Sequence, residues 1–378
     1  MIDLSAIDPI LLLASLMVAS TPILLAATGE LVTERAGVLN LGVEGMMITG
    51  SVVGFIVATG ADGLICAEGG ALCRLGAATP NLLGFSAAAL GGATMALLFA
   101  ILTQFLLSNQ VATGLALTLF GLGIAALLGQ GYLGVKSPGL ADWPIPVLSD
   151  IPWLGRILFH HDPIVYLSLV LVAGVWAVLT YTRAGLILRA VGENHDAAHA
   201  LGYNVVLVRI LAICFGGACA GLGGAYLSLV RVPTYAEGLT AGAGWIALAI
   251  VVFASWRPWR LLAGAYLFGG VTMLQLNFQA AGVSLIVLLP WLTGIGALAV
   301  AGAWAIRRRP ASRTKALGWT AALALFTLLL IAIRAMGWGF DETLWLSASP
   351  YLATILVLVV ISAGRAPGSL GRPFHASG

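Results

Sequence analysis

The sequence predicts an all-α polytopic membrane protein with about ten or eleven transmembrane helices. Of its 378 residues, 60% are apolar and only 9% are Asp, Glu, Lys or Arg. Soluble domains carry about 25% charged residues, so this composition excludes a water-soluble enzyme. The apolar residues also gather in runs of about 20, the length that a helix needs to cross a bilayer. The net charge of +3 is too small to indicate a nucleic-acid partner.

Each expected helix corresponds to one apolar run, and we treat residues 1–378 as a single transmembrane domain. The runs at 241–255 and 350–363 are short, so these helices are expected to be tilted or partial. No Lys or Arg precedes Arg35, so the first run lacks the basic region of a cleavable signal peptide and is interpreted as a retained helix. The runs are 10–29, 37–60, 82–107, 112–131, 163–182, 205–230, 241–255, 260–281, 284–306, 316–336 and 350–363.

Basic and acidic residues separate onto alternating connections. The positive-inside rule assigns the arginine-rich connections to the cytoplasm, which places the N-terminus outside and the C-terminus inside. The basic set is Arg183, Arg189, Arg209, Arg257, Arg260, Arg307, Arg308, Arg309, Arg313, Lys315, Arg365 and Arg372. The acidic set on the other side is Asp62, Glu68, Asp142, Asp150, Asp162, Glu237, Asp341 and Glu342.

The four cysteines fall into two pairs. Cys66 and Cys73 bracket a polar, glycine-rich loop, and a disulfide between them is one interpretation if that loop faces an oxidising compartment. Spacing alone does not establish the geometry that a disulfide needs. Cys214 and Cys219 lie in an apolar run and are interpreted as packing residues.

Polar residues at the start of the second run are the first candidates for a solute pathway. Asn40 and Glu44 are four residues apart, so a helix through both would place them on one face. An ionisable group at this depth costs a few kcal/mol unless it is paired or hydrated, so a functional role is expected. A structural hydrogen bond from Glu44 to a neighbouring helix is the alternative. Glu34 and Arg35 lie nearer the boundary, where we expect an ion pair.

Two further polar clusters have helical spacing. Asn109 and Thr113 share a face at the start of the fourth run, and Gln275 and Gln279 share a face in the eighth. Neutral amides and hydroxyls along a path suit a polar, uncharged solute, whereas a cation path would favour carboxylates.

The glycine-rich run 216–225 does not predict a phosphate-binding loop. It lies within a span, and neither of the two lysines, Lys136 and Lys315, follows a glycine as the motif requires. Small residues at this spacing instead let helices pack closely in lipid. We therefore expect no nucleotide site in the chain.

The connection 183–209 is predicted to be a cytoplasmic loop with a short helix and a turn before the next span. Its central sequence, Asp196-Ala-Ala-His-Ala-Leu-Gly202, resembles the Glu-Ala-Ala…Gly coupling motif of ABC-importer permeases. The stretch 34–47 resembles permeases of the branched-chain amino acid and ribose superfamily, and is most similar to the simple-sugar and nucleoside branch, which depends on basic membrane proteins. The stretches 109–114, 221–225, 244–249 and 349–373 fit the same branch.

The resemblance implies the fold of an ABC-importer permease in the bacterial inner membrane, with no cofactor of its own. It implies a second, different permease subunit as partner, a cytoplasmic ABC ATPase that hydrolyses ATP, and an extracytoplasmic substrate-binding lipoprotein. The solute would be a nucleoside or nucleobase, a simple sugar, or a vitamin such as riboflavin. The residues that would couple to the ATPase are Gly192, Glu193, Asp196, Ala197, Ala198 and Gly202.

The chain departs from the family pattern in two places. Asp196 stands where the motif usually has Glu, a change that keeps the charge. The segment 283–347 reads as an inserted helical pair ahead of the family-like ending. The pair would leave the C-terminus on the same side of the membrane.

Two other functions use different features of the sequence. Glycine-rich, broken regions near 37–50 and 238–250 would also suit an ion-coupled secondary transporter. His195 and His199, four residues apart, resemble the zinc pair of an intramembrane metalloprotease. Against the protease, the pair lies outside any predicted span, and Asp196 replaces the Glu that would act as general base.

Overall fold

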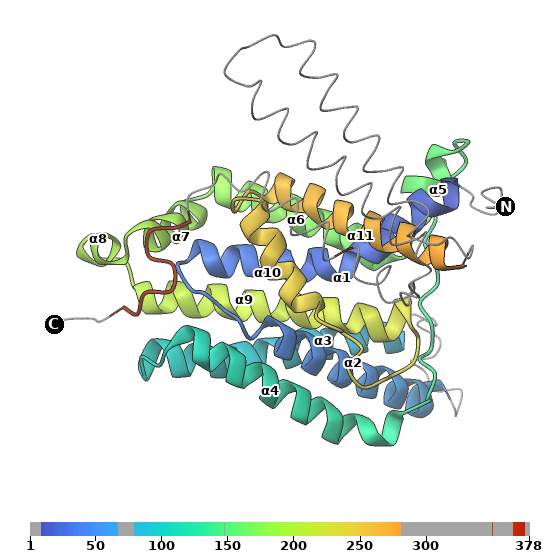
Figure 1. Cartoon of the computed structure of the whole chain (residues 1–378), viewed down its shortest axis with the longest axis horizontal. Coiled ribbons are helices and arrows are strands. Elements are labelled where there is room, and N and C mark those ends of the chain that lie inside the picture. Colours follow the sequence, from blue (N-terminus) through green and yellow to red (C-terminus); the bar gives the residue numbers. More distant parts are fainter. Residues whose placement is uncertain (1–8, 67–78, 147, 281–349, 351–365, 375–378) are drawn as a thin grey trace, which may run out of the picture. The chain divides into compact units, whose positions relative to one another are not determined.

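The computed structural model describes residues 9–66, 79–146, 148–280, 350 and 366–374 (Figure 1). They belong to two units, which we describe separately. The main unit comprises Leu13–Gly270 and Ala353–Gly378, and the second comprises Met1–Leu12 and Val271–Leu352. Cys73, the expected insertion at 283–347 and most of the last expected span lie outside the described residues. The disulfide and the inserted pair therefore stay predictions.

Seven helices in the described part are long and apolar enough to cross a membrane, which confirms the all-α polytopic class. The one other span expected there, 241–255, is the helix α10 of 11 residues. At 1.5 Å per residue α10 covers about half of a bilayer, as expected for a partial span. The helices are α1 Pro9–Arg35, α2 Val43–Cys66, α3 Thr79–Ala100, α4 Gln110–Gly129, α5 Leu154–Leu158, α6 Pro163–Tyr181, α7 Arg183–Glu193, α8 His195–Ala200, α9 Val205–Tyr226, α10 Ala243–Phe253 and α11 Pro258–Ala280. Short π- and 3-10 turns extend α3, α4 and α9 as Ile101–Phe105, Gln130–Tyr132 and Leu227–Arg231.

Five helices begin directly after a polar residue whose side chain accepts hydrogen bonds from the first turn. These side chains satisfy backbone N–H groups that the helix itself leaves unpaired. Such caps fix where each helix enters the bilayer or the loop. The cap residues are Asn109 for α4, Asp162 for α6, Thr182 for α7, Asn194 for α8 and Asn204 for α9.

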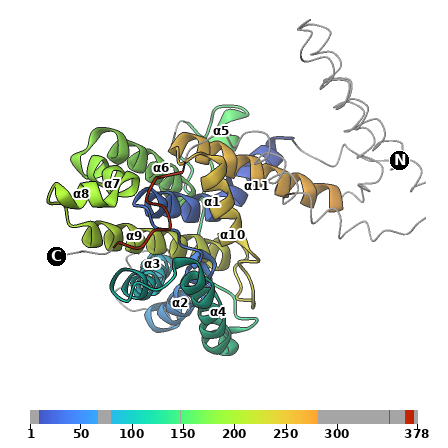
Figure 2. The same ribbon diagram turned by 60° about the vertical axis from the view of Figure 1, so that its left-hand side comes forward.

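Helix α9 lies between α1 on one side and α2 and α3 on the other (Figure 2). Its glycine face allows this close packing. A methyl group at Gly221 would overlap the Ala88 carbonyl of α3, and one at Gly224 would overlap the Met47 carbonyl of α2. The prediction that the 216–225 run serves helix packing is confirmed.

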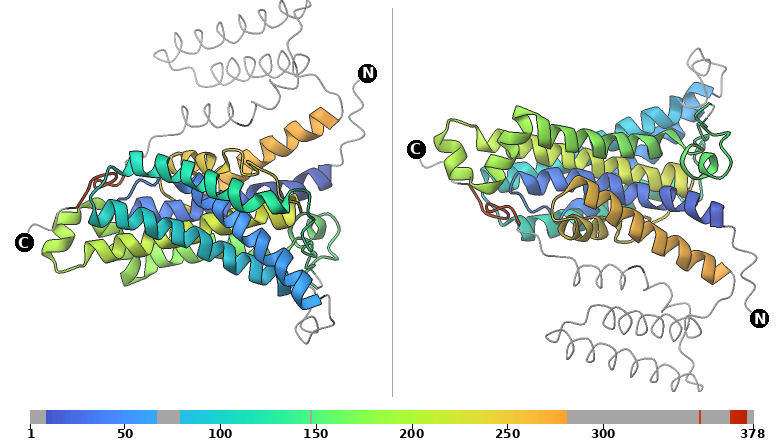
Figure 3. Two further views of the ribbon diagram at one scale, coloured as in Figure 1. Left: turned by 90° about the horizontal axis from the view of Figure 1, so that it is seen from below. Right: turned by 90° about the horizontal axis from the view of Figure 1, so that it is seen from above.

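The two ends of the main unit differ in charge, as predicted. Arg189 on α7, together with Arg257 and Arg260 at the start of α11, lines one pocket at the end that also holds the C-terminal segment 366–374 (Figure 3). At the opposite end, Asp162 accepts a hydrogen bond from the Tyr226 hydroxyl at 2.7 Å. Burial raises the pKa of the Asp162 carboxyl.

Candidate functional site

The connection between α1 and α2 is the centre of the polar contacts in the main unit. Gly37 has a φ of 84°, and α2 begins only at Val43. The expectation that Asn40 and Glu44 share a helix face is therefore wrong. The left-handed turn at Gly37 ends the first helix, and Asn40 lies in the connection that follows it.

Asn40 is fully buried and links this connection to α1. Its Oδ1 accepts a hydrogen bond from the Gly42 N–H at 3.0 Å, and its Nδ2 donates to Glu30 Oε2 at 3.3 Å. The other carboxylate oxygen of Glu30 is buried and has no partner among the described residues. A buried carboxylate oxygen of this kind is a favourable position for a bound water.

Glu44 holds the half-helix α10 in place. Its Oε1 accepts hydrogen bonds from the Thr240 hydroxyl at 2.5 Å and the Gly242 N–H at 3.0 Å, and its Oε2 accepts one from the Gly244 N–H at 2.7 Å. The carboxylate thus lies at the N-terminus of α10, where the helix dipole favours a negative charge. This geometry matches the structural interpretation of Glu44, that of a hydrogen bond to a neighbouring helix.

The predicted pair Asn109 and Thr113 does not reach this centre. Asn109 is exposed, and its side chain is occupied as the N-cap of α4. The hydroxyl of Thr113 lies 2.8 Å from that of Ser108 in the preceding turn. Both contacts are local. Asn109 and Thr113 therefore stabilise the turn at the start of α4 and do not form the expected polar face.

Two other residues of α4 make the contact instead. The Gln110 side chain is buried, and its Oε1 accepts a hydrogen bond from the Leu39 N–H at 2.9 Å. The Thr118 hydroxyl donates to the Leu41 carbonyl at 3.1 Å. We call the set of buried polar side chains around the α1–α2 connection the polar centre: Glu30, Asn40, Glu44, Gln110, Thr118 and Thr240.

Glu34 and Arg35 do not form the expected ion pair. The Glu34 carboxylate accepts a hydrogen bond from Trp256 Nε1 at 2.5 Å, and the Arg35 guanidinium donates to the Trp256 carbonyl at 3.1 and 2.7 Å. Adjacent helix residues point in different directions, so the two side chains hold one tryptophan from two sides. Ser255 and Trp256 have φ values of 51° and 54°, and these contacts hold that strained turn in place.

Gln275 and Gln279 lie one turn apart on α11, as the sequence predicts. Both belong to the second unit. Their part in a pathway with the polar centre stays a prediction.

The segment 183–209 has the predicted form of a short helix and a turn before the next span. The helix α8 carries Asp196, Ala197 and Ala198, and Gly202 follows it with a φ of 88°. Asp196 and Ala197 are exposed, whereas Ala198 is buried. A side chain at Gly202 would meet no atom within 4 Å, so only its backbone conformation requires glycine.

The C-terminal segment 366–374 fastens α7 and α8 to the bundle. The Ser369 N–H donates to the Gly192 carbonyl at 2.9 Å, and the Ser369 hydroxyl accepts from the His195 N–H at 3.1 Å. The Phe374 ring packs edge-on against the rings of His195 and His199 at 5.4 and 5.2 Å between centroids.

Arg209 on α9 links the α1–α2 connection, the C-terminal segment 366–374 and α8. Its guanidinium donates to the Ala36 carbonyl at 3.3 Å and the Arg372 carbonyl at 3.1 Å, and lies 3.2 Å from His195 Nδ1. Burial, followed by the charge of Arg209, lowers the pKa of the His195 ring.

In the described ranges, no three His, Cys, Asp or Glu side chains are grouped as a metal site would require.

Sequence reasoning missed Gln110, Thr118, Thr240 and Arg209. One signal was present: Gln110 directly follows an N-cap residue and so takes the first helical position, turned inward. No local pattern marks Thr240 or Arg209, because their partners lie 196 and up to 173 residues away.

Comparisons with known proteins agree on one family. The family model described as the permease component of branched-chain amino acid transport systems matches residues 12–293. The "Putative glucose ABC transporter permease protein TsgC13" of Haloferax volcanii is 40% identical over 279 residues, 72% of this chain and 79% of that protein. The guanosine ABC transporter permease protein NupQ of Bacillus subtilis is 32% identical over 275 residues, 71% and 82% of the two chains. The nucleoside ABC transporter permease protein NupC of Lactococcus lactis is 31% identical over 270 residues, 70% and 81% of the two chains. No solved structure matches.

Proposed function

We propose a solute and a mode of energy coupling for this chain from one premise: it belongs to the permease-component family of branched-chain amino acid transport systems. As a multi-pass membrane permease, it provides a passage for a solute. We propose that it is the membrane subunit of an ATP-driven importer for a nucleoside or a simple sugar. The names of its relatives, which refer to glucose, guanosine and nucleosides, support this solute class.

The observation that carries the proposal is the construction of α7 and α8. The outer surface of this segment is exposed, including Asp196 and Leu201, whose exposed fraction is 75%. Its inner surface is fixed to the spans by Arg209 and by the C-terminal segment 366–374. A rigid, exposed projection that is anchored in the membrane bundle suits a lever moved by another subunit.

We propose three partners that complete the importer. A cytoplasmic ATPase would bind the exposed surface of α8 and supply the energy, because the sequence predicts no nucleotide site in this chain. A second permease would pair with this one, with the solute passing between them. An extracytoplasmic lipoprotein would deliver the solute. In this arrangement Glu44 is a positioning residue that holds α10 beside the passage, and Asn40 orders the connection ahead of it.

Reconstitution tests the proposal with a matched pair of variants. Gly202 and Gly134 both have positive φ, 88° and 77°, and both have open space where a side chain would stand, but they lie at opposite ends of the spans. We expect Gly202→Val to abolish uptake by vesicles that hold the complete importer, while the receptor still binds solute and Gly134→Val supports uptake. Asp196→Asn should also impair uptake.

Two results would contradict the proposal. One is full uptake by the Gly202→Val complex. The other is uptake by the isolated chain driven by an ion gradient without an ATPase, which would establish the secondary-transporter alternative.

A further inference from the structure

A cavity of about 400 Å³ opens at the arginine-rich end of the main unit. Four arginines and three tryptophans line it, supplied by α1, α6, α7 and the turn that begins α11. We call it the arginine pocket, and its lining includes Arg35, Arg189, Arg257, Arg260, Trp176 and Trp259. The Trp176 and Trp259 rings pack at 5.7 Å between centroids and form one wall.

The arginines of the pocket form no ion pair within the described part of the chain. No carboxylate oxygen there lies within 4 Å of any of its four guanidinium groups. Arg189 repels the Arg35 guanidinium, Glu193 attracts it less strongly, and Arg257 adds a still smaller repulsion. Arg189, Arg257 and Arg260 are exposed, so their donors are available to a ligand. An anion here would relieve mutual repulsion.

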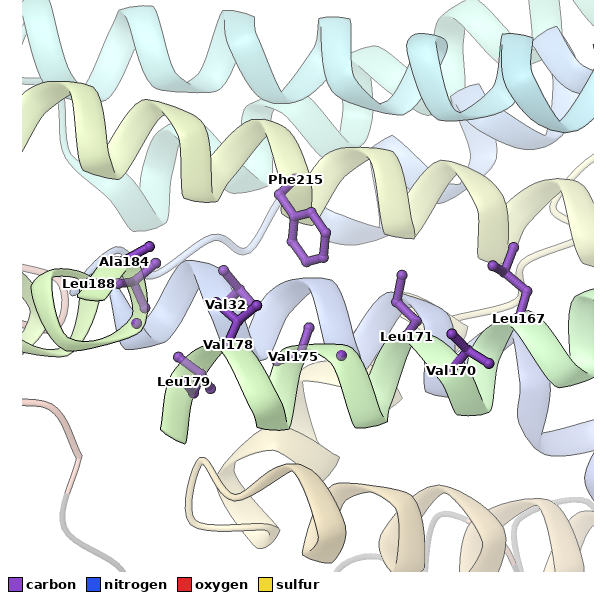
Figure 4. Close-up of a pocket in the computed structure, with 12 residues that line it drawn as sticks. Val32, Leu167, Val170, Leu171, Val175, Val178, Leu179, Ala184, Leu188 and Phe215 are labelled. Atoms are coloured by element: carbon purple, nitrogen blue, oxygen red, sulfur yellow. The ribbon is translucent and has the colours of Figure 1, made fainter. Parts of the chain in front are cut away.

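A second cavity of about 400 Å³ has one lining residue, Leu179, in common with the arginine pocket. It runs along α6 toward the other side of the membrane, and its lining side chains are apolar (Figure 4). Residues of α6 from Leu167 to Leu179 form one wall, and Val32 of α1 and Phe215 of α9 form the others. We call it the apolar groove.

We propose that the arginine pocket and the apolar groove together bind an anionic phospholipid. The phosphate would accept hydrogen bonds from Arg189, Arg257 and Arg260, because guanidinium groups match phosphate oxygens in charge and geometry. One acyl chain would lie in the apolar groove. Basic pockets between helices on the cytoplasmic side are suited to acidic headgroups, and tryptophans favour the same interface. The assignment does not depend on which solute is transported.

The apolar groove decides between a lipid and other anionic partners. A soluble phosphate would use the arginines and leave the groove empty. An acidic surface of the ATPase could reach the arginines, but it would not extend along a membrane-spanning helix. Only a lipid combines a negative headgroup with an apolar chain that continues into the bilayer.

Lipid retention measured by native mass spectrometry tests the site. The complete importer would be reconstituted in mixed phosphatidylglycerol and phosphatidylcholine vesicles, extracted, and analysed for bound lipid. We expect the Arg189→Gln/Arg260→Gln variant to retain about tenfold less phosphatidylglycerol, since two charged contacts to phosphate are lost. Arg183→Gln, an exposed arginine of α7 outside the pocket, should retain as much as the unchanged protein.

A second pair of variants tests the groove without touching the charges. Gly174 lines the apolar groove, and Gly123 lies on α4, and both have open space where a side chain would stand. Gly174→Phe should fill the groove and lower phosphatidylglycerol retention, whereas Gly123→Phe should not.

Three outcomes would overturn the proposal. The first is equal retention of the two lipids by the unchanged protein. The second is that inorganic phosphate displaces phosphatidylglycerol at equal concentration, which would assign the pocket to a free anion. The third is that the double arginine variant loses the ATPase subunit with its lipid unchanged, which would make the pocket a protein contact.

Discussion

The polar centre and the arginine pocket differ in whether the protein itself supplies partners for their charged groups. They differ in this way although Arg35 of the pocket lies between Glu30 and Glu44 in the sequence. In the polar centre, both oxygens of Glu44 accept hydrogen bonds from the protein itself. In the arginine pocket, no carboxylate oxygen of the described residues lies within 4 Å of a guanidinium group. A charge enclosed by protein needs internal partners, whereas a charge at the membrane surface can receive them from outside. The comparison shows that the Glu44 carboxylate holds protein segments together, and it supports our proposal that the arginine pocket binds a ligand.

The largest effect is expected at Arg209, which is as enclosed as the polar centre. Arg209→Met would leave two backbone carbonyls and the His195 ring without their donor. We expect it to lower the free energy of unfolding by about 3 kcal/mol, measured by thermal unfolding of the purified chain in detergent. The same substitution at Arg260, in the open pocket, should change it by less than about 0.5 kcal/mol. Equal losses would break the distinction between the two regions.

A smaller loss of stability is expected when Glu44 is replaced. This variant also tests whether stability can change while the amount of protein in the membrane does not. Glu44→Gln keeps one acceptor oxygen but turns an N–H₂ group toward backbone donors of α10. We expect a loss of about 1–3 kcal/mol in the free energy of unfolding and reduced uptake, with the amount of protein in the membrane unchanged. Glu237→Gln, at an exposed carboxylate outside the coupling segment, is the control. If Glu44→Gln lowers only the folding yield, Glu44 has no part in the working transporter beyond assembly.

The sequence was sufficient for features that depend on runs and spacing, but not for features that depend on distant partners. The spans, the partial helix at 241–255, the turn after α8 and the gathering of arginines at one end of the main unit all follow from local composition. The register at Asn40 and Asn109 was wrong because a glycine turn and a cap each shift a helix start by a few residues. Such shifts are within the usual uncertainty of a predicted boundary, yet they change which side chain points inward.

The anchoring of α8 could not be predicted for a different reason. Arg209 reads as one more cytoplasmic arginine, and nothing in the sequence around Ser369 indicates that it lies against Gly192. Only the folded chain brings these segments together, across 163 residues in the case of Arg209 and Arg372.

The smallest predicted effect is a pH dependence of stability that arises from His195. This side chain is buried like the polar centre, but it faces charged groups. Arg209 is 3.2 Å away, Asp196 is 3.5 Å away, and Arg372 adds a weaker repulsion. The pKa of His195 is lowered in the folded chain, so the unfolded chain binds more protons between that pKa and about 6.5. Stability should therefore rise with pH across that interval, by at most about 1.4 kcal/mol per pH unit, and level off above it.

Thermal unfolding of the full chain between pH 5 and pH 8 measures this slope. His195→Gln retains an acceptor for Arg209 but does not titrate, so its profile should be flatter by that amount. An identical slope in the variant would assign the pH dependence to other groups.

The fastening of α8 by residues near the end of the chain has a consequence for biosynthesis. During translation, the spans α1 to α9 leave the ribosome long before Ser369 and Phe374 exist. Under our proposal, the ATPase-binding surface of α8 stays incomplete until residues 366–374 have been made, so a polypeptide truncated before them would lack that surface. We therefore expect that deletion of residues 366–374 would weaken binding of the ATPase without preventing insertion of the spans.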